Sequence, residues 1–210
     1  MSRTPLMESY FVAAYWGARQ ESSMQCAHRL KSFLVELSDI SDDFLTWKRV
    51  SSKKSQKTEF SAHEVSLELL SSFLKSGTNR TDDDNDELAE LGFRFTLWNE
   101  GNGINSASLS IHCGMYSTVE GLSNAIFLEV PSGFDIEDIS ARRSLLLTFV
   151  NSWDPEWAAL ASFSERDKNG LGGPFFDKAL YVSSLENDPV NDVSSAEILP
   201  NEGYLYLSRS

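Results

Sequence analysis

Cysteine is scarce in this chain, because Cys26 and Cys113 are the only two among 210 residues. Two cysteines are too few for the disulfide framework of a small secreted protein and are consistent with a reducing cytoplasm. Long apolar runs are missing as well: the longest, Tyr10–Trp16 and Leu145–Val150, are far shorter than a helix that spans a bilayer. The first eight residues contain no apolar segment behind a charged end. We therefore expect no signal peptide and a cytoplasmic protein.

Basic residues are few. Lysine and arginine number 18 against 31 acidic residues, which gives a net charge of −13 and a pI near 4.6. A surface this negative repels nucleic-acid phosphates and anionic lipids, so we expect neither a nucleic acid nor a membrane as partner. It favours a basic protein instead. Residues 61–163 alone carry −11, so this segment should dominate any electrostatic attraction.

Motifs for catalysis are also absent. The chain has no Gly-x-Ser-x-Gly and no phosphate-cradling glycine pattern, and no lysine has an acid two residues before it, as a carboxylate-x-Lys nuclease site would need. Cys26, His28, His112 and Cys113 could supply zinc ligands, but their spacing on a predicted helix and strand makes the side chains diverge. A buried Cys113 beside an exposed His112 is the ordinary alternative. We predict no catalytic residues, no metal and no cofactor.

Large apolar side chains are plentiful: phenylalanine, tyrosine and tryptophan total 24 residues. Such a chain can bury a sizeable core, and at this length one domain over residues 1–210 is favoured, with residues 1–9 as a flexible N-terminus. Hydrophobic periodicity predicts three helices. The first spans 22–38, the second begins at a capping box at 61–64 and ends at a left-handed Gly77, and the third spans 136–153. It predicts strands over 10–16, 93–98, 106–113, 124–130, 157–163, 179–185 and 204–207.

The order of these elements predicts the fold class. Strands outnumber helices, and the turn signal Glu100-Gly-Asn-Gly103 joins two strands into a hairpin. Residues 44–50 suit a short helix or an irregular bridge, and the lysine-rich 51–59 an exposed loop. We expect an α+β single domain with a largely antiparallel sheet and about three main helices packed on it.

One acidic run stands out. Six acids fall within nine residues and no base interrupts them: Asp82, Asp83, Asp84, Asp86, Glu87 and Glu90. Carboxylates can ligate a hard cation, but an EF-hand loop from Asp82 would need glycine at Glu87 and an acid at Phe93. A patch that faces a partner and a plain solvated loop remain as the other two interpretations.

The segment Trp153-Asp-Pro-Glu-Trp157 places two indoles around a negative turn. Tryptophan is enriched in binding hot spots, and a nearby acid suits a basic partner. The alternative is that both indoles belong to the core. We expect Trp153 to complete the apolar stripe of its helix, Trp157 to pack beneath the turn, and Glu156 to face outward and contribute to binding.

Several segments together resemble the immunity protein 52 family of bacterial polymorphic toxin systems. They occur in order over residues 10–185: Ala14-Tyr-Trp-Gly17 with Arg19 and Glu21, Asn79-Arg80-Thr-Asp-Asp83, Glu90-Leu-Gly-Phe93, Leu97-Trp-Asn99, Leu109–Ser117, Asn124–Pro131 and Trp153–Trp157. Each is short, and their order and spacing carry the resemblance. The segment Asp167–Pro174 and the chain after Leu185 show no such likeness.

This resemblance implies a function. Such a protein binds and neutralises a cognate toxin inside the bacterial cytoplasm. The toxin is typically a nuclease with a restriction-endonuclease fold, delivered by a contact-dependent system such as type VI secretion. The resemblance transfers no catalytic residues. A basic nuclease groove would be complementary to a protein of charge −13, so toxin-binding residues are expected at Asp82, Asp83, Asp84, Asp86, Glu87 and Glu156. Another cytoplasmic interaction module, or an enzyme whose site forms only in three dimensions, remains an alternative. The sequence does not determine the oligomeric state.

Overall fold

Strands and helices are interspersed along the part of the chain that the structure describes. The structure, a computed structural model, describes residues 8–50, 57–81, 83–84, 86–99, 106–170, 173–190 and 193–209. Its helices are α1 (Ser23–Ile40), α2 (Leu67–Ser76), α3 (Ile139–Trp153) and α4 (Phe163–Asn169). Its strands are β1 (Tyr10–Trp16), β2 (Thr46–Val50), β3 (Lys57–Ser61), β4 (Phe93–Asn99), β5 (Ala107–Cys113), β6 (Asn124–Glu129), β7 (Trp157–Ser162), β8 (Ala179–Val182), β9 (Glu197–Ile198) and β10 (Tyr204–Leu207).

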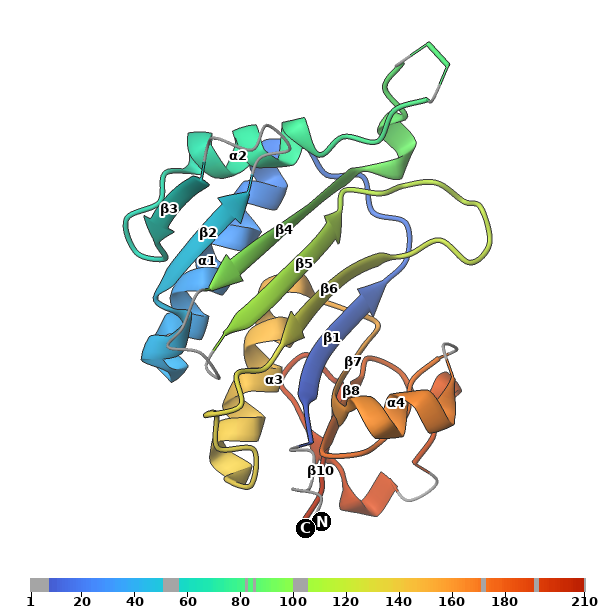
Figure 1. The fold of residues 1–210 in the computed structure, drawn as a ribbon. Helices are drawn as coiled ribbons and strands as arrows, with labels where there is room; N and C mark the ends of the chain where they lie inside the picture. The colour runs from blue at the N-terminus through green and yellow to red at the C-terminus, as the bar shows by residue number, and fades with distance from the viewer. Residues whose placement is uncertain are drawn as a thin grey trace, which may run out of the picture.

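Within these residues the ten strands form one antiparallel sheet in the order β3-β2-β4-β5-β6-β1-β7-β8-β10-β9 (Figure 1). Helices α1, α2 and α3 cover one face of the sheet, and the short α4 lies on the other face. The predicted α+β class and the antiparallel sheet are confirmed, with α4 as a fourth helix that the sequence did not indicate. None of the described helices is both long and apolar enough to cross a bilayer.

Strand β1 lies in the interior of the sheet, and its residues alternate between two packed faces. Val12, Ala14 and Trp16 belong to the main core beneath the long helices. Phe11 faces the other side, where its ring lies 5.2 Å from that of Phe163 at the start of α4. Because both faces are covered, β1 is an almost continuous apolar run rather than an alternating one.

The region 42–61 differs from the prediction. A 3-10 turn spans Asp42–Phe44, and β2 and β3 then form an antiparallel ribbon in which Trp47 lies opposite Phe60. The buried Trp47 donates its indole N–H to the carbonyl of Phe44, three residues earlier, at 2.8 Å. The apolar spacing over 44–50 therefore belongs to the 3-10 turn and the start of β2 rather than to a helix. The end of the predicted loop, Lys57–Glu59, is part of β3, and residues 51–56 lie outside the described residues.

The predicted start of the second helix and the left-handed conformation of Gly77 are wrong, whereas the helix does end at Gly77. Ser61 ends β3, and the N-cap of α2 is Ser66, whose hydroxyl accepts a hydrogen bond from the Leu69 amide at 3.1 Å. Gly77 has φ −101° rather than a left-handed conformation. A glycine fits there because a Cβ would collide with the Arg94 carbonyl of β4.

The first helix, the third helix and the hairpin agree with the prediction. The Ser22–Gln25 capping box opens α1, α3 ends at Trp153 ahead of Pro155, and β4 pairs with β5 from Phe93↔Cys113 onward. The turn Glu100–Gly103 that suggested this hairpin and residues 1–7 of the expected N-terminal segment lie outside the described residues.

Candidate functional site

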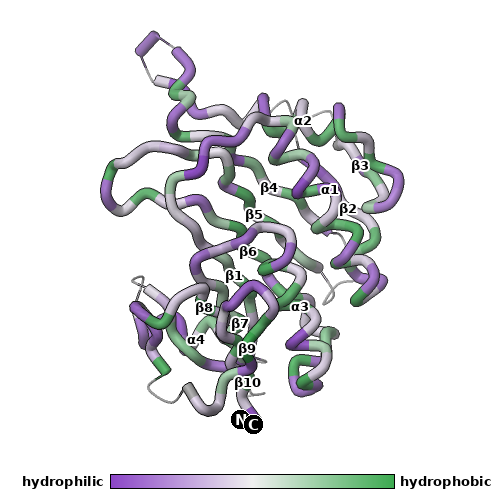
Figure 2. The backbone as a smooth tube through the Cα atoms, turned by 180° about the vertical axis from the view of Figure 1, so that it is seen from behind, coloured by the Kyte–Doolittle hydropathy of each residue, from purple (hydrophilic) through white to green (hydrophobic). Residues whose placement is uncertain are grey.

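Most of the described residues of the acidic run lie on a narrow hairpin that precedes β4 and projects beyond the ends of the strands (Figure 1). Two backbone hydrogen bonds build this acidic hairpin (residues 79–88): Thr81 N–H donates to the Asp86 carbonyl at 2.9 Å, and Leu88 N–H donates to the Asn79 carbonyl at 2.8 Å. The hairpin is strongly hydrophilic (Figure 2). Its exposed acids are Asp83, Asp84, Asp86 and Glu87, of which Glu87 pairs with Arg80; Asp82 lies outside the described residues.

The connection between β5 and β6 (residues 114–123) is hydrogen-bonded to the 3-10 turn Ala89–Leu91 that follows the hairpin. The amides of Tyr116 and Ser117 both donate to the carbonyl of Glu90, at 2.9 and 3.0 Å. This connection exposes two apolar side chains, Val119 at 63% and Leu122 at 41%. Neither residue was predicted from the sequence as part of a binding surface, although apolar side chains in a loop rich in glycine and serine are a usable signal for one.

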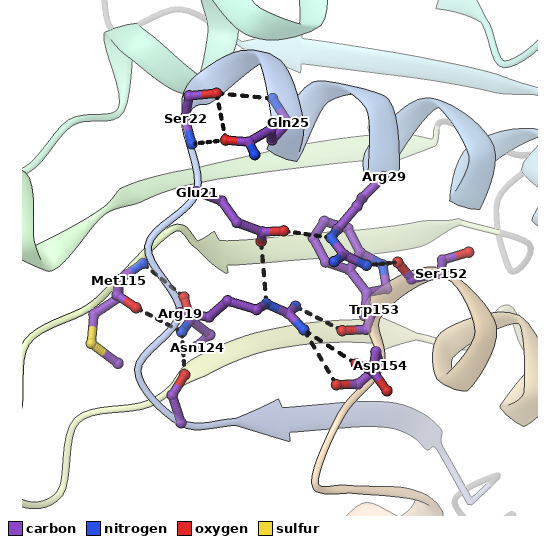
Figure 3. Close-up of polar contacts among 11 residues, drawn as sticks. Arg19, Glu21, Ser22, Gln25, Arg29, Met115, Asn124, Ser152, Trp153 and Asp154 are labelled. Carbon is purple, nitrogen blue, oxygen red and sulfur yellow. Dashed lines mark hydrogen bonds and ion pairs between the residues drawn. The ribbon is translucent and has the colours of Figure 1, made fainter. Parts of the chain in front are cut away.

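A buried charged cluster holds the segment that follows β1 against the C-terminus of α3 (Figure 3). The Glu21 carboxylate, only 8% exposed, pairs with Arg19 at 3.3 Å and with Arg29 at 2.7 Å. Arg19 donates to the Trp153 carbonyl at 2.7 Å, and Arg29 donates to the Ser152 carbonyl at 3.0 Å. Two cations thus satisfy the free carbonyls at the C-terminus of α3, where the helix dipole favours positive charge.

The Arg19 guanidinium also lies over the Trp16 ring, 4.9 Å from its centroid. Burial lowers the pKa of Arg19, and the charge of Glu21 opposes that shift. Because the donors described above go to Glu21 and to the end of α3, this cluster fixes the chain after β1 against α3. Its role is therefore to position the neighbouring loops.

Asn124 makes a second anchor at the start of β6 (Figure 3). Its side chain accepts from the Met115 amide at 2.8 Å and donates to the carbonyls of Gly17 and Met115, at 2.6 and 3.0 Å. The Arg19 amide donates to the same Met115 carbonyl at 2.8 Å. The β5–β6 connection is thereby tied to the segment that follows β1.

The turn between α3 and β7 brings Glu156 to the same end of the strands as the start of β6 and the end of β1. Trp153 is fully buried and stacks on Trp16 at 5.4 Å, so its expected place in the core is confirmed. Glu156 is exposed, as expected, but its carboxylate also accepts the Gly17 amide at 3.0 Å. A Cβ at Gly17 would approach that carboxylate oxygen to 2.9 Å, so the glycine lets the Glu156 carboxylate lie close against the backbone. Trp157 is half-buried and stacks on Tyr15 at 4.3 Å.

These three segments form one surface, which we call the loop edge: the acidic hairpin, the β5–β6 connection and the turn 154–156. Hydrogen bonds connect them in series, from Glu90 through Met115 to Arg19 and the end of α3. The exposed acids of these segments are Asp83, Asp84, Asp86, Glu87, Glu120, Asp154 and Glu156, and the exposed Glu90 lies in the turn just after the hairpin. Among the described residues of the three segments, the cation Arg80 is paired with Glu87. The loop edge therefore combines negative charge with exposed Val119 and Leu122.

A cavity of about 350 Å³ opens where the loop edge meets α4. Leu122 comes from the β5–β6 connection, Glu156 and Trp157 from the turn, and Arg166 from α4. Arg166 is held by Asp167 at 3.1 Å and lies 4.8 Å from the centre of the Phe163 ring. The fold thus brings Glu156 into a cavity that the sequence gave no sign of.

The four residues with zinc-ligand chemistry do not form a site. Cys26 and Cys113 are both buried and share a hydrogen bond, which together with burial raises the pKa of the Cys113 thiol well above its usual value. His112 is half-buried rather than exposed, because its ring contacts the Leu91 carbonyl at 3.0 Å. Over the described part of the chain, no three His, Cys, Asp or Glu side chains are grouped as metal ligands.

Comparison with known proteins assigns the chain to a family. No curated protein matches it. Among solved structures, a Pseudomonas aeruginosa T6SS protein, PA0821, is 12% identical to this chain with a TM-score of 0.43. The match covers 74% of this chain and 40% of that protein, and a likeness this distant indicates no shared function. The family described as Immunity protein 52 matches residues 8–205 and is non-catalytic. The chain belongs to the immunity protein 52 family.

Proposed function

We propose that this protein binds a cognate toxin in the cytoplasm of the bacterium that makes it and neutralises the toxin by stoichiometric protein–protein contact. Membership of the immunity protein 52 family implies a toxin as partner. The observation that supports the loop edge as the contact surface is its mixture of exposed acids with the apolar Val119 and Leu122. Binding hot spots combine such apolar anchors with a charged rim.

The charge of the chain supports a nuclease as the toxin. A nuclease presents a basic groove to its phosphate backbone substrate, and eight exposed acids along one edge are complementary to such a groove. Residues 61–163, which include the acidic hairpin and the turn, carry −11 of the total −13. In this proposal the acidic hairpin attracts the toxin over long range, and the apolar side chains of the β5–β6 connection make the close contacts.

Titration of purified toxin tests this proposal directly. The protein and the toxin encoded beside it should co-purify, and toxin activity should fall linearly to zero at a fixed molar ratio. The expected dissociation constant is nanomolar or tighter, as for other effective protein inhibitors. Complete inactivation by far less than one equivalent of the protein would show turnover and refute stoichiometric binding.

Variants of exposed apolar residues map the contact surface. Val119→Ser and Leu122→Ser together should weaken toxin binding, whereas Trp98→Ala should not. Trp98 makes a matched control because it is also exposed, at 47%, but lies on β4 rather than on the loop edge. The opposite result, loss of binding in the Trp98 variant alone, would move the contact surface onto the open face of the sheet.

A further inference from the structure

A second cavity, of about 650 Å³, continues from the first on the other side of Glu156 and Trp157. The end of β8 forms its far wall, where the Ser183 amide donates to the Glu156 carbonyl at 2.8 Å. Beyond it Ser184 accepts from the Glu186 amide at 3.3 Å, so the chain turns and Glu186 joins the lining. Pro174 closes the remaining side.

The lining of this cavity has one sign of charge. Glu156 and Glu186 are its ionisable residues, both are exposed, and no cation is present among the lining residues that the structure describes. One oxygen of Glu156 accepts the Gly17 amide, and a carboxylate has room for further donors. Over the described chain, the Glu186 carboxylate has no hydrogen bond or ion pair. Two acceptor groups therefore lie beside the half-buried indole of Trp157.

We propose that this cavity holds an arginine side chain of the toxin, an inference that rests on the proposed function. A planar guanidinium stacks on an aromatic ring and donates in pairs to carboxylates, which fits a cavity lined by a half-buried indole and two carboxylates. Arg166 lines the first cavity but not the second, so of these two only the second cavity has ionisable groups that are all acidic among its described lining residues. The arginine would anchor the toxin at the end of the loop edge.

Charge-neutral variants of the two acids test this anchor in the complex. Glu156→Gln with Glu186→Gln keeps an oxygen that can accept the Gly17 amide while removing both charges. Toxin affinity should fall about tenfold or more for each carboxylate. The matched control, Glu64→Gln with Glu68→Gln, removes two exposed acids before and within α2 and should bind as the parent does. Equal affinity of the two double variants would overturn the proposal.

A small-molecule titration tests the same cavity without the toxin. N-acetyl-arginine amide should shift the indole N–H resonance of Trp157, identified with a Trp157→Phe variant, and the neutral citrulline analogue should not. Equal shifts from both compounds, or a shift from neither, would overturn the arginine assignment. If the parent protein fails to bind the toxin at all, the proposed function fails, whereas the arginine titration still reports on the cavity.

Discussion

Replacing Glu21 with glutamine should destabilise the fold by about 2–3 kcal/mol. Glu21 is the carboxylate that pairs with both Arg19 and Arg29, and its side chain is only 8% exposed, whereas the Asp154 carboxylate reaches Arg19 only at 4.0 Å. Removing one partner of a buried ion pair costs about 3–5 kcal/mol because the other charge is left without compensation. The arginine side chains are 24% and 32% exposed, so water recovers part of that cost.

Urea denaturation of the parent and the Glu21→Gln variant measures this loss. For a chain of this size the corresponding fall in melting temperature is about 4–12 °C. Glu197→Gln is the control, since its pair with Arg143 is exposed on both sides and should be worth at most about 1 kcal/mol. If the Glu21 variant loses no more than the Glu197 variant, the buried cluster does not stabilise the end of α3.

A double-mutant cycle separates the charge effect from lost packing. Adding Arg29→Met to Glu21→Gln removes one of the two cations left unpaired. The double variant should then lose less than the sum of the single losses, with a coupling of about 0.5–3 kcal/mol. Additive losses would show that Glu21 and Arg29 stabilise the protein independently.

Three further predictions concern the core, the acidic hairpin and pH. Trp153→Ala should cost about 3–5 kcal/mol of unfolding free energy because the indole is fully buried, while the folded fraction keeps its toxin affinity; a loss of affinity with unchanged stability would place this indole at the interface. A variant with asparagine at Asp82, Asp83, Asp84 and Asp86 neutralises the acidic hairpin. In stopped-flow experiments it should associate with the toxin more slowly than the parent at low salt and at nearly the same rate at high salt. Identical rates at low salt would exclude the hairpin from the electrostatic contact. Burial and the charge of Asp39 raise the pKa of Glu36 in the folded state, so its charged form destabilises the fold. The stability that the protonated carboxyl allows at low pH is lost as pH rises through this raised pKa. Glu36→Gln should therefore gain about 0.2–0.5 kcal/mol at pH 7 but not well below the usual glutamate pKa, and a gain that is equal at both pH values would contradict this cause.

Much of the fold follows from the sequence alone, because its signals are local. The Ser22–Gln25 capping box, the apolar stripe that ends at Trp153 and the alternation in β4 and β5 each depend on neighbours within four residues. The same holds for the exposure of Glu156, which follows from its alternation with Trp157 at the start of a strand. The family resemblance adds the toxin as partner, because it depends on the order of short segments rather than on contacts.

Only the tertiary structure decided how the functional surface is assembled. Gly17 and Glu156 are 139 residues apart, yet a hydrogen bond joins them. Ser183 comes from a third segment, bonds to the Glu156 carbonyl and lines the second cavity. The β2–β3 ribbon likewise depends on pairing across the sheet, and it overrides a helical spacing of apolar residues. Periodicity records which face of one element is apolar, but it carries no information about which distant loops meet. That choice is made by packing of the whole sheet against its helices, so the loop edge and its cavities become visible only in three dimensions.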